Sequence, residues 1–180
     1  MAATRVRRMR RVEYERLVSI GFFGPEERLE LVGGVLVVRE PQGSQQATGI
    51  RRVETVLRQV FGAGWDVRSQ LPVALDDESE PEPDVAVVPG TYDDYQDAHP
   101  TRPVLIVEIA DSGLAFDRTD KASLYARAGI IDDWIVNIAE AVLEVYRPRL
   151  IRGDFVTPLA AAPGARLAVA GLLSERAHPK

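Results

Sequence analysis

Two short apolar segments, each interrupted by one carboxylate, constrain this chain more than any other feature of its sequence. Asp84 leads into the apolar segment 81–88, and Glu108 follows five apolar residues in the segment 103–110. Strands with so few polar residues are usually central in a sheet and buried on both faces. An anion there is costly unless a cation or strong hydrogen-bond donors compensate it. The sequence therefore predicts a polar site within a buried sheet.

The residue composition limits the chemistry that such a site can carry. The chain has 180 residues, 46% of them hydrophobic and 27% charged, which is typical of one ordinary globular domain. It has no cysteine and only two histidines, His99 and His178. Disulfides, thiolate metal sites and a cysteine nucleophile are thus excluded, and an imidazole-based zinc site is disfavoured. A hard cation held by carboxylates is the remaining metal chemistry.

The distribution of charge is uneven, although the net charge of −5 argues against a general nucleic-acid binder. Five arginines and no acidic residue occur in the first eleven positions, namely Arg5, Arg7, Arg8, Arg10 and Arg11. This segment is either a solvated chain end or an arm whose Arg5, Arg7 and Arg8 contact phosphates. No apolar run approaches the length of about 18 residues that spans a bilayer, and none follows the arginines. We therefore expect a cytoplasmic protein without a membrane partner.

The hydrophobic pattern predicts a mixed β-sheet flanked by helices. The expected helices cover residues 11–20, 44–61, with Ser44 as N-cap, and about 117–128, with Asp117 or Thr119 as N-cap. The expected strands cover residues 29–32, 35–38, 65–75, 81–88, 103–110, 130–138 and 142–146. We divide the chain into a basic arm (1–12), one domain (13–150) and a C-terminal extension that packs on it (151–180). No glycine-rich loop joins a strand to a helix, which excludes NTPase and dinucleotide-binding folds.

The carboxylates and a lysine indicate phosphodiester hydrolysis with a divalent metal. Mg²⁺ prefers oxygen ligands, and we expect Asp84, Glu108 and the carbonyl of Ile109 to provide them. Lys121 follows on the next helix, where it would orient the attacking water or balance charge in the transition state. Glu30, in the first hairpin, would bind a second metal or hold a metal-bound water.

Each of these residues also has a structural interpretation. Asp84 would then be a turn residue that satisfies nearby backbone amides, and Lys121 would be a solvated surface lysine. Glu30 would form an edge-strand ion pair with Arg28 or Arg39. On this interpretation the carboxylates stabilise the fold and have no catalytic role.

Six blocks of the sequence, taken together, resemble a known family. They are Leu-Glu-Leu-Val-Gly-Gly (29–34), Pro-Asp-Val (83–85), Val-Leu-Ile-Val-Glu-Ile (104–109), the series Asp117, Lys121 and Tyr125, Gly-Ile (129–130) and Asp-Trp-Ile-Val (133–136). In this order and spacing they resemble the Uma-type family (DUF820) of the PD-(D/E)XK nuclease superfamily, over residues 14–146. The resemblance implies a restriction-endonuclease-like α/β (mixed α+β) fold, with a central mixed β-sheet flanked by helices.

The resemblance also assigns roles to individual residues. The aspartate of the Pro-Asp block corresponds to Asp84, the strand glutamate to Glu108 and the hairpin glutamate to Glu30. The superfamily lysine normally lies two residues after the strand glutamate, where this chain has Ala110. In this family it has moved to the following helix, which matches Lys121. From the residue pattern alone, we expect Asp117 on that helix to be a cap and Tyr125 to be a core residue.

The start of the helix at residue 44 departs from the family pattern. Members commonly carry a histidine there, whereas residues 44–48 of this chain contain none. Gln46 is a candidate to bind a phosphate or water, but it cannot transfer a proton as imidazole does. The resemblance implies a Mg²⁺- or Mn²⁺-dependent DNA endonuclease, and by analogy a homodimer, because cutting two strands needs two sites. The alternatives are a nuclease-like domain that binds nucleic acid or a protein without cleaving, and a metal-carboxylate enzyme acting on a small phosphorylated compound.

Overall fold

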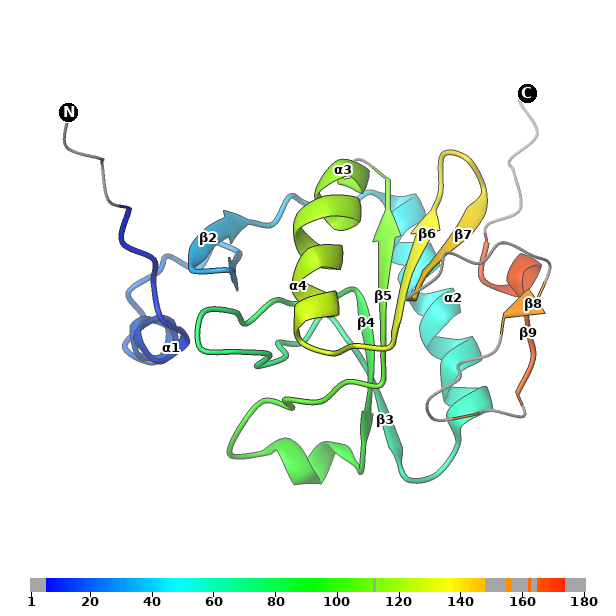
Figure 1. The fold of residues 1–180 in the computed structure, drawn as a ribbon, viewed down its shortest axis with the longest axis horizontal. Helices are drawn as coiled ribbons and strands as arrows, with labels where there is room; N and C mark the ends of the chain where they lie inside the picture. Colours follow the sequence, from blue (N-terminus) through cyan, green and yellow to red (C-terminus); the bar gives the residue numbers. More distant parts are fainter. Residues whose placement is uncertain (1–5, 112, 148–154, 157–161, 163–164, 174–180) are drawn as a thin grey trace.

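A five-stranded mixed sheet forms the centre of the computed structural model, which describes residues 6–111, 113–147, 155–156, 162 and 165–173 (Figure 1). The strands lie in the order β3 (Trp65–Ser69), β4 (Val85–Pro89), β5 (Leu105–Ala110), β6 (Asp132–Asn137) and β7 (Val142–Tyr146). The β5–β6 pair is parallel and the other neighbours are antiparallel. Every residue of β5 is buried, as the largely apolar segment around Glu108 predicted, and every residue of β6 is buried as well. The mixed sheet with its flanking helices confirms the predicted fold class.

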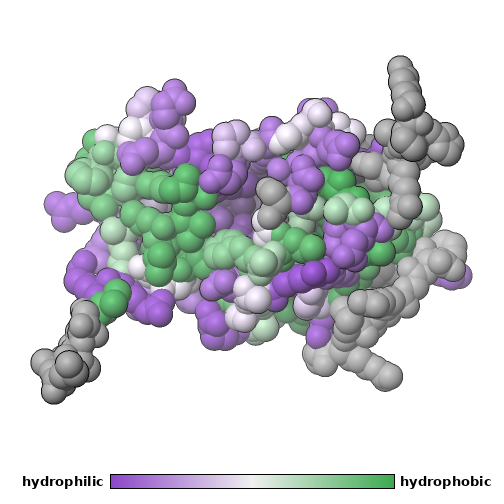
Figure 2. All heavy atoms as spheres, turned by 90° about the horizontal axis from the view of Figure 1, so that it is seen from above, coloured by the Kyte–Doolittle hydropathy of each residue, from purple (hydrophilic) through white to green (hydrophobic). Residues whose placement is uncertain are grey.

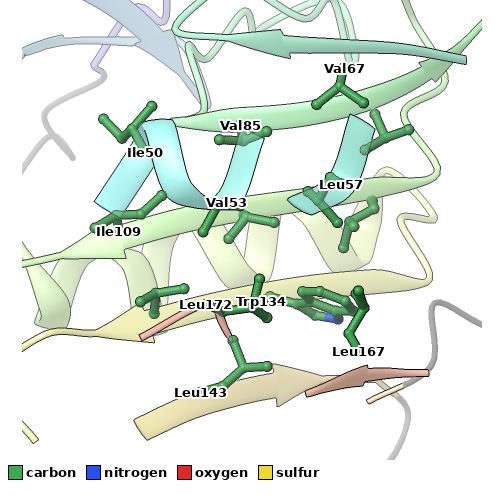
Figure 3. Packing of buried hydrophobic residues seen from close by; sticks show 14 of the residues in the cluster. Ile50, Val53, Leu57, Val67, Val85, Ile109, Trp134, Leu143, Leu167 and Leu172 are labelled. Atoms are coloured by element: carbon green, nitrogen blue, oxygen red, sulfur yellow. The ribbon is translucent and has the colours of Figure 1, made fainter. Parts of the chain in front are cut away.

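Helix α2 (Ser44–Phe61) covers one face of this sheet. Its buried Ile50, Val53 and Leu57 recur at helical spacing and pack on β3, β4 and β5 in the larger core cluster (Figure 3). The helix has its predicted bounds, but its N-cap is Gly43, not Ser44. At Gly49 the helix approaches β5 so closely that an added Cβ would lie 3.0 Å from Cγ2 of Ile109.

One continuous helix covers the other face. It consists of α3 (Leu114–Phe116), a π-helical turn (Asp117–Lys121) and α4 (Ala122–Arg127). The predicted helix start with Asp117 or Thr119 as N-cap was wrong, because the helix begins at Leu114. Leu124 and Tyr125 are fully buried in a second apolar cluster, to which the predicted core residue Tyr125 therefore belongs.

A two-stranded hairpin lies beside this helix. Strands β1 (Leu29–Val32) and β2 (Val35–Val38) have their predicted bounds, and Gly33 and Gly34 form the turn with φ of +55° and +77°. Positive φ at both turn residues is what a two-residue hairpin of this type requires. The backbone of Leu31 exchanges two hydrogen bonds with Glu80, which joins β1 to the loop that precedes β4. This loop carries the chain on to Asp84.

The remaining segments differ from prediction mainly in length. Helix α1 (Arg11–Ser19) is present and buries Tyr14. The strand expected over residues 65–75 ends at Ser69, because Gln70 adopts a left-handed φ of +55°. The strands expected at 81–88, 103–110 and 130–138 are shorter, as β4, β5 and β6 show.

The C-terminal part contributes to the larger core cluster. Strand β8 (Phe155–Val156) pairs with β9 (Leu167–Ala168), and the side chains of Leu167 and Leu172 are buried against residues of the sheet and α2 (Figure 3). Among the described residues, no helix is long and apolar enough to span a membrane.

Candidate active site

A pocket of about 260 Å³ opens at the end of β5, between β2 and the π-helical turn. Glu30, Asp84, Glu108 and Lys121 all line this pocket, although they come from four different parts of the chain. Seen from above in Figure 2, this side of the molecule has a recessed hydrophilic area bordered by apolar surface. The structure therefore brings the four candidate catalytic side chains together.

Asp84 is anchored at the start of β4. Its Oδ2 accepts a hydrogen bond of 2.8 Å from the backbone N–H of Ile109, and its own N–H donates to Glu108 Oε2 at 3.2 Å. The first bond agrees with the structural interpretation of Asp84, but the carboxylate also lines the pocket. Burial, followed by the charge of Glu108, raises the pKa of Asp84 to about 6. The two carboxylates are thus close enough to repel each other.

Glu108 receives hydrogen bonds from two residues of the helix that covers it. Lys121 Nζ lies 3.2 Å from Glu108 Oε1, and the Tyr125 hydroxyl donates to the same oxygen at 2.6 Å. Both side chains are buried, which makes these charge-assisted bonds strong. They fix the carboxylate in one orientation.

Lys121 is a buried cation and not a solvated lysine. Its Nζ lies 3.2 Å from Glu30 Oε1 as well as 3.2 Å from Glu108 Oε1. Burial lowers the pKa of Lys121, but the surrounding carboxylates, Glu108 first and Glu30 next, outweigh burial and raise it. Lys121 therefore stays protonated near neutral pH. The other oxygen of Glu30 accepts a 2.9 Å hydrogen bond from the N–H of Glu82.

The expected partners of Glu30 were wrong. Its ion pair is with Lys121, while Arg39 binds the carboxylate of Glu82 at 2.6 Å and that of Asp84 at 3.5 Å. Gln46 also reaches the site, because its Nε2 lies 3.4 Å from Asp84 Oδ2.

The arginines of the N-terminal segment lie apart from the pocket lining. Arg7 pairs with Glu13, Arg8 donates to the carbonyl of Gly33, and neither lines the pocket. Arg5 lies outside the described residues. The polar segment 90–103 does not line the pocket either.

Asp117 belongs to the site, although the sequence predicts it to be a helix cap. It lines the pocket from the π-helical turn, and burial together with Glu108 raises its pKa to about 8. The four-residue spacing of Asp117, Lys121 and Tyr125 was a usable signal, since residues so spaced share one helix face. A π-helical turn is frequent at functional sites, but no pattern in the sequence predicts this one.

The donor atoms suit a hard divalent cation. Within the described residues, no group of three or more His, Cys, Asp or Glu side chains is arranged to hold a metal ion. Mg²⁺, however, needs only one or two carboxylates and completes its shell with water. The N–H of Ile109 points to Asp84, and a residue's N–H and C=O point to the same side of a strand, so its carbonyl faces this edge too. Six acidic residues line the pocket against two basic ones, an imbalance that a cation would relieve.

The family model and the solved structure that resemble this chain are both described as nucleases. A family model described as "Uma2: Putative restriction endonuclease" matches residues 11–172. The fold is similar to that in the "crystal structure of a putative nuclease belonging to DUF820" from Anabaena variabilis, with a TM-score of 0.70 and 15% identity. That similarity covers 86% of this chain and 94% of the other. No curated protein is significantly similar to the chain.

Proposed function

Because the chain belongs to the Uma2 family, we propose that it is a divalent-metal-dependent endonuclease that hydrolyses phosphodiester bonds of DNA. One observation carries the proposal: Asp84, Glu108 and Lys121 converge in one pocket, where both the N–H of Asp84 and the Lys121 ammonium contact the carboxylate of Glu108. Two buried carboxylates beside a buried lysine are difficult to account for by stability alone, since buried ion pairs rarely stabilise a fold.

Each residue has a distinct role in this proposal. Asp84, Glu108 and the carbonyl of Ile109 would hold Mg²⁺ or Mn²⁺, which when bound polarises the phosphate and supplies hydroxide near neutral pH. The surrounding carboxylates raise the pKa of Lys121, so Lys121 would act as a cation that stabilises negative charge on the phosphate and orients water, and not as a base. Glu30 holds the Lys121 ammonium in place.

The substrate and the assembly follow from the same chemistry. Gln46 lies at the pocket wall, where it can donate to a phosphate or to water, and Arg5, Arg7 and Arg8 would contact the backbone of DNA outside it. Cutting both strands of a duplex calls for two sites, so the proposal includes a two-fold homodimer. Cellular DNA as substrate agrees with the cytoplasmic location expected from the sequence.

Metal binding and DNA cleavage, measured on the same proteins, test this proposal. We expect calorimetry to detect Mn²⁺ binding to the unmodified protein and a loss of binding in Asp84→Asn and Glu108→Gln. Cleavage of plasmid DNA should fall at least about a hundredfold in both variants. Asp97→Asn, which changes an exposed carboxylate outside the pocket, is the control and should retain both properties. Equal cleavage by Asp84→Asn and the unmodified protein would refute the proposal.

One observation favours a second candidate function, a nuclease-like domain that binds nucleic acid or a protein without cleaving. Residues 44–48 lack a histidine, and the Gln46 amide is already directed at Asp84. The predicted signature is DNA binding that is unchanged by Mn²⁺ and by Asp84→Asn, with no cleavage. Hydrolysis of small phosphate esters, but not of DNA, would instead indicate an enzyme of small phosphorylated compounds.

A further inference from the structure

The outer edge of β2 carries backbone groups that the hairpin itself does not use. Arg39 donates its N–H to the carbonyl of Arg28, so the hydrogen-bonded pairs of the hairpin are 39 with 28, 37 with 30, and 35 with 32. By the same alternation the N–H and C=O of Leu36 and Val38 point away from β1. In the part of the chain that the structure describes, no hydrogen bond is recorded to these groups from another residue.

This edge is apolar and carries no charged residue within the strand. Val35 is 52% exposed and Val38 64% exposed, and all four residues of β2 are Val or Leu. Natural edge strands are commonly blocked by lysine, proline or a bulge, none of which occurs in β2, so the short length of four residues is its main protection. Figure 2 shows a broad apolar surface on the left, over the part of the molecule where Figure 1 places α1 and β2.

We propose that the outer edge of β2 pairs with the same strand of a second copy of this chain, as an antiparallel two-fold ladder. In a register centred on Val37, Leu36 of one copy lies opposite Val38 of the other. The backbone N–H and C=O of both residues point away from β1, so each such pair exchanges two hydrogen bonds between the copies. The ladder therefore stays within the four-residue strand. The strand is thus complementary to itself, which a two-fold interface requires.

Charge beyond the ends of the ladder favours a second copy as the occupant. Continuing the register places Glu40 of the second copy opposite Gly34, over which the side chain of Arg8 packs. Glu40 is exposed, so an acidic and a basic side chain meet at each end of the ladder. The backbone of Gly34 is already bonded to Met9 and Glu78, which ends the ladder there.

This interface would adjoin both pockets. Val37 and Val38 belong to β2 and also line the pocket that holds Asp84 and Glu108. The inference rests on the homodimer of the proposed function, for which it names the surface. Its test needs neither DNA nor metal, so failure of the interface and absence of nuclease activity are distinguishable.

Sedimentation equilibrium over a wide range of concentration tests the interface. The unmodified protein should approach twice the mass of the chain at high concentration. Val35→Lys and Val38→Lys put a solvated cation on exposed edge positions and should raise the dissociation constant at least about tenfold. Val18→Lys, at a position on α1 that is equally exposed at 52%, is the matched control and should dimerise normally.

Amide hydrogen exchange gives a second, local readout. The N–H groups of Leu36 and Val38 should exchange slowly at high protein concentration, and fast in Val35→Lys or on dilution. Circular dichroism should show the same fold for all variants. A mass that stays monomeric throughout, or equal dissociation of Val18→Lys and Val35→Lys, overturns the proposal. Slow exchange of these two amides in a monomer would assign the edge to a partner within the chain, and would overturn it too.

Discussion

Lys121 Nζ lies 3.2 Å from Glu108 Oε1, although the two residues are 13 positions apart and belong to different elements. Glu108 projects from β5 and Lys121 from the π-helical turn that packs over it. The ammonium therefore reaches the strand carboxylate from the helix, not from the strand itself.

Removing the buried cation should destabilise the protein. Lys121→Met leaves Glu30 and Glu108 buried without their ion-pair partner, and breaking such a pair costs about 3–5 kcal/mol. Urea unfolding monitored by circular dichroism measures the change. Adding Glu30→Gln to Lys121→Met removes one of the unpaired charges and should recover part of the loss. A loss below about 1 kcal/mol in Lys121→Met would contradict the structure.

The hydroxyl of Tyr125 should orient Glu108 for metal binding. Tyr125→Phe deletes the 2.6 Å hydrogen bond to Glu108 Oε1, a bond to a charged group worth about 1.5–3 kcal/mol. We expect lower stability and weaker Mn²⁺ binding by calorimetry. Tyr14→Phe is the matched control, since its hydroxyl donates at 2.8 Å to the carbonyl of Leu29, outside the pocket. Tyr14→Phe should reduce stability and leave the affinity for Mn²⁺ unchanged. Equal Mn²⁺ affinities in the two variants would argue against a positioning role for Tyr125.

Mn²⁺ affinity should depend on pH through Asp84. Its pKa is raised to about 6 by burial and by Glu108, and the metal must displace the proton that Asp84 binds below that pH. The apparent affinity should therefore fall about tenfold per pH unit below pH 6 and level off above it. Calorimetry in buffers of different ionisation enthalpy would count the released protons. An affinity that does not change between about pH 5 and pH 7 would exclude Asp84 as the titrating ligand.

Asp133 should make stability fall as pH rises. Burial, followed by the charge of Glu108, raises its pKa from 3.8 to about 8, and its Oδ1 has no hydrogen-bond partner among the described residues. Between these values the folded state holds a proton that the unfolded state has lost, so the contribution of Asp133 to stability decreases with pH by at most about 1.4 kcal/mol per unit. Asp133→Asn removes this dependence.

The difference in unfolding free energy between Asp133→Asn and the unmodified protein should therefore shift in favour of the variant from about pH 5 to pH 8. Urea titrations at several pH values measure it. Asp97→Asn, an exposed substitution, should show a difference that is constant with pH. A constant difference for Asp133→Asn as well would show that Asp133 is ionised in the folded protein.

Much of the fold was predictable because its signals are local. The bounds of α2, β1, β2 and β7 match the prediction, since each is set by hydrophobic periodicity and, in α2, β1 and β2, also by a flanking glycine. The start of the third helix was not predictable in this way. Asp117 has the residue type of a cap, and only its position beside the buried carboxylates shows that it lies within the helix and faces the pocket.

The sequence by itself determined which residues are unusual. Asp84 and Glu108 interrupt apolar strands, and the cost of burying a carboxylate makes such positions informative without a structure. Tertiary structure alone decided how these charges are compensated: Lys121 lies between Glu30 and Glu108, and Arg39 binds Asp84 in place of Glu30. Ion pairing depends on distances of a few ångström between segments that are remote in the chain. Those distances are set by how the helix and the hairpin pack on the sheet, which no local pattern in the sequence encodes.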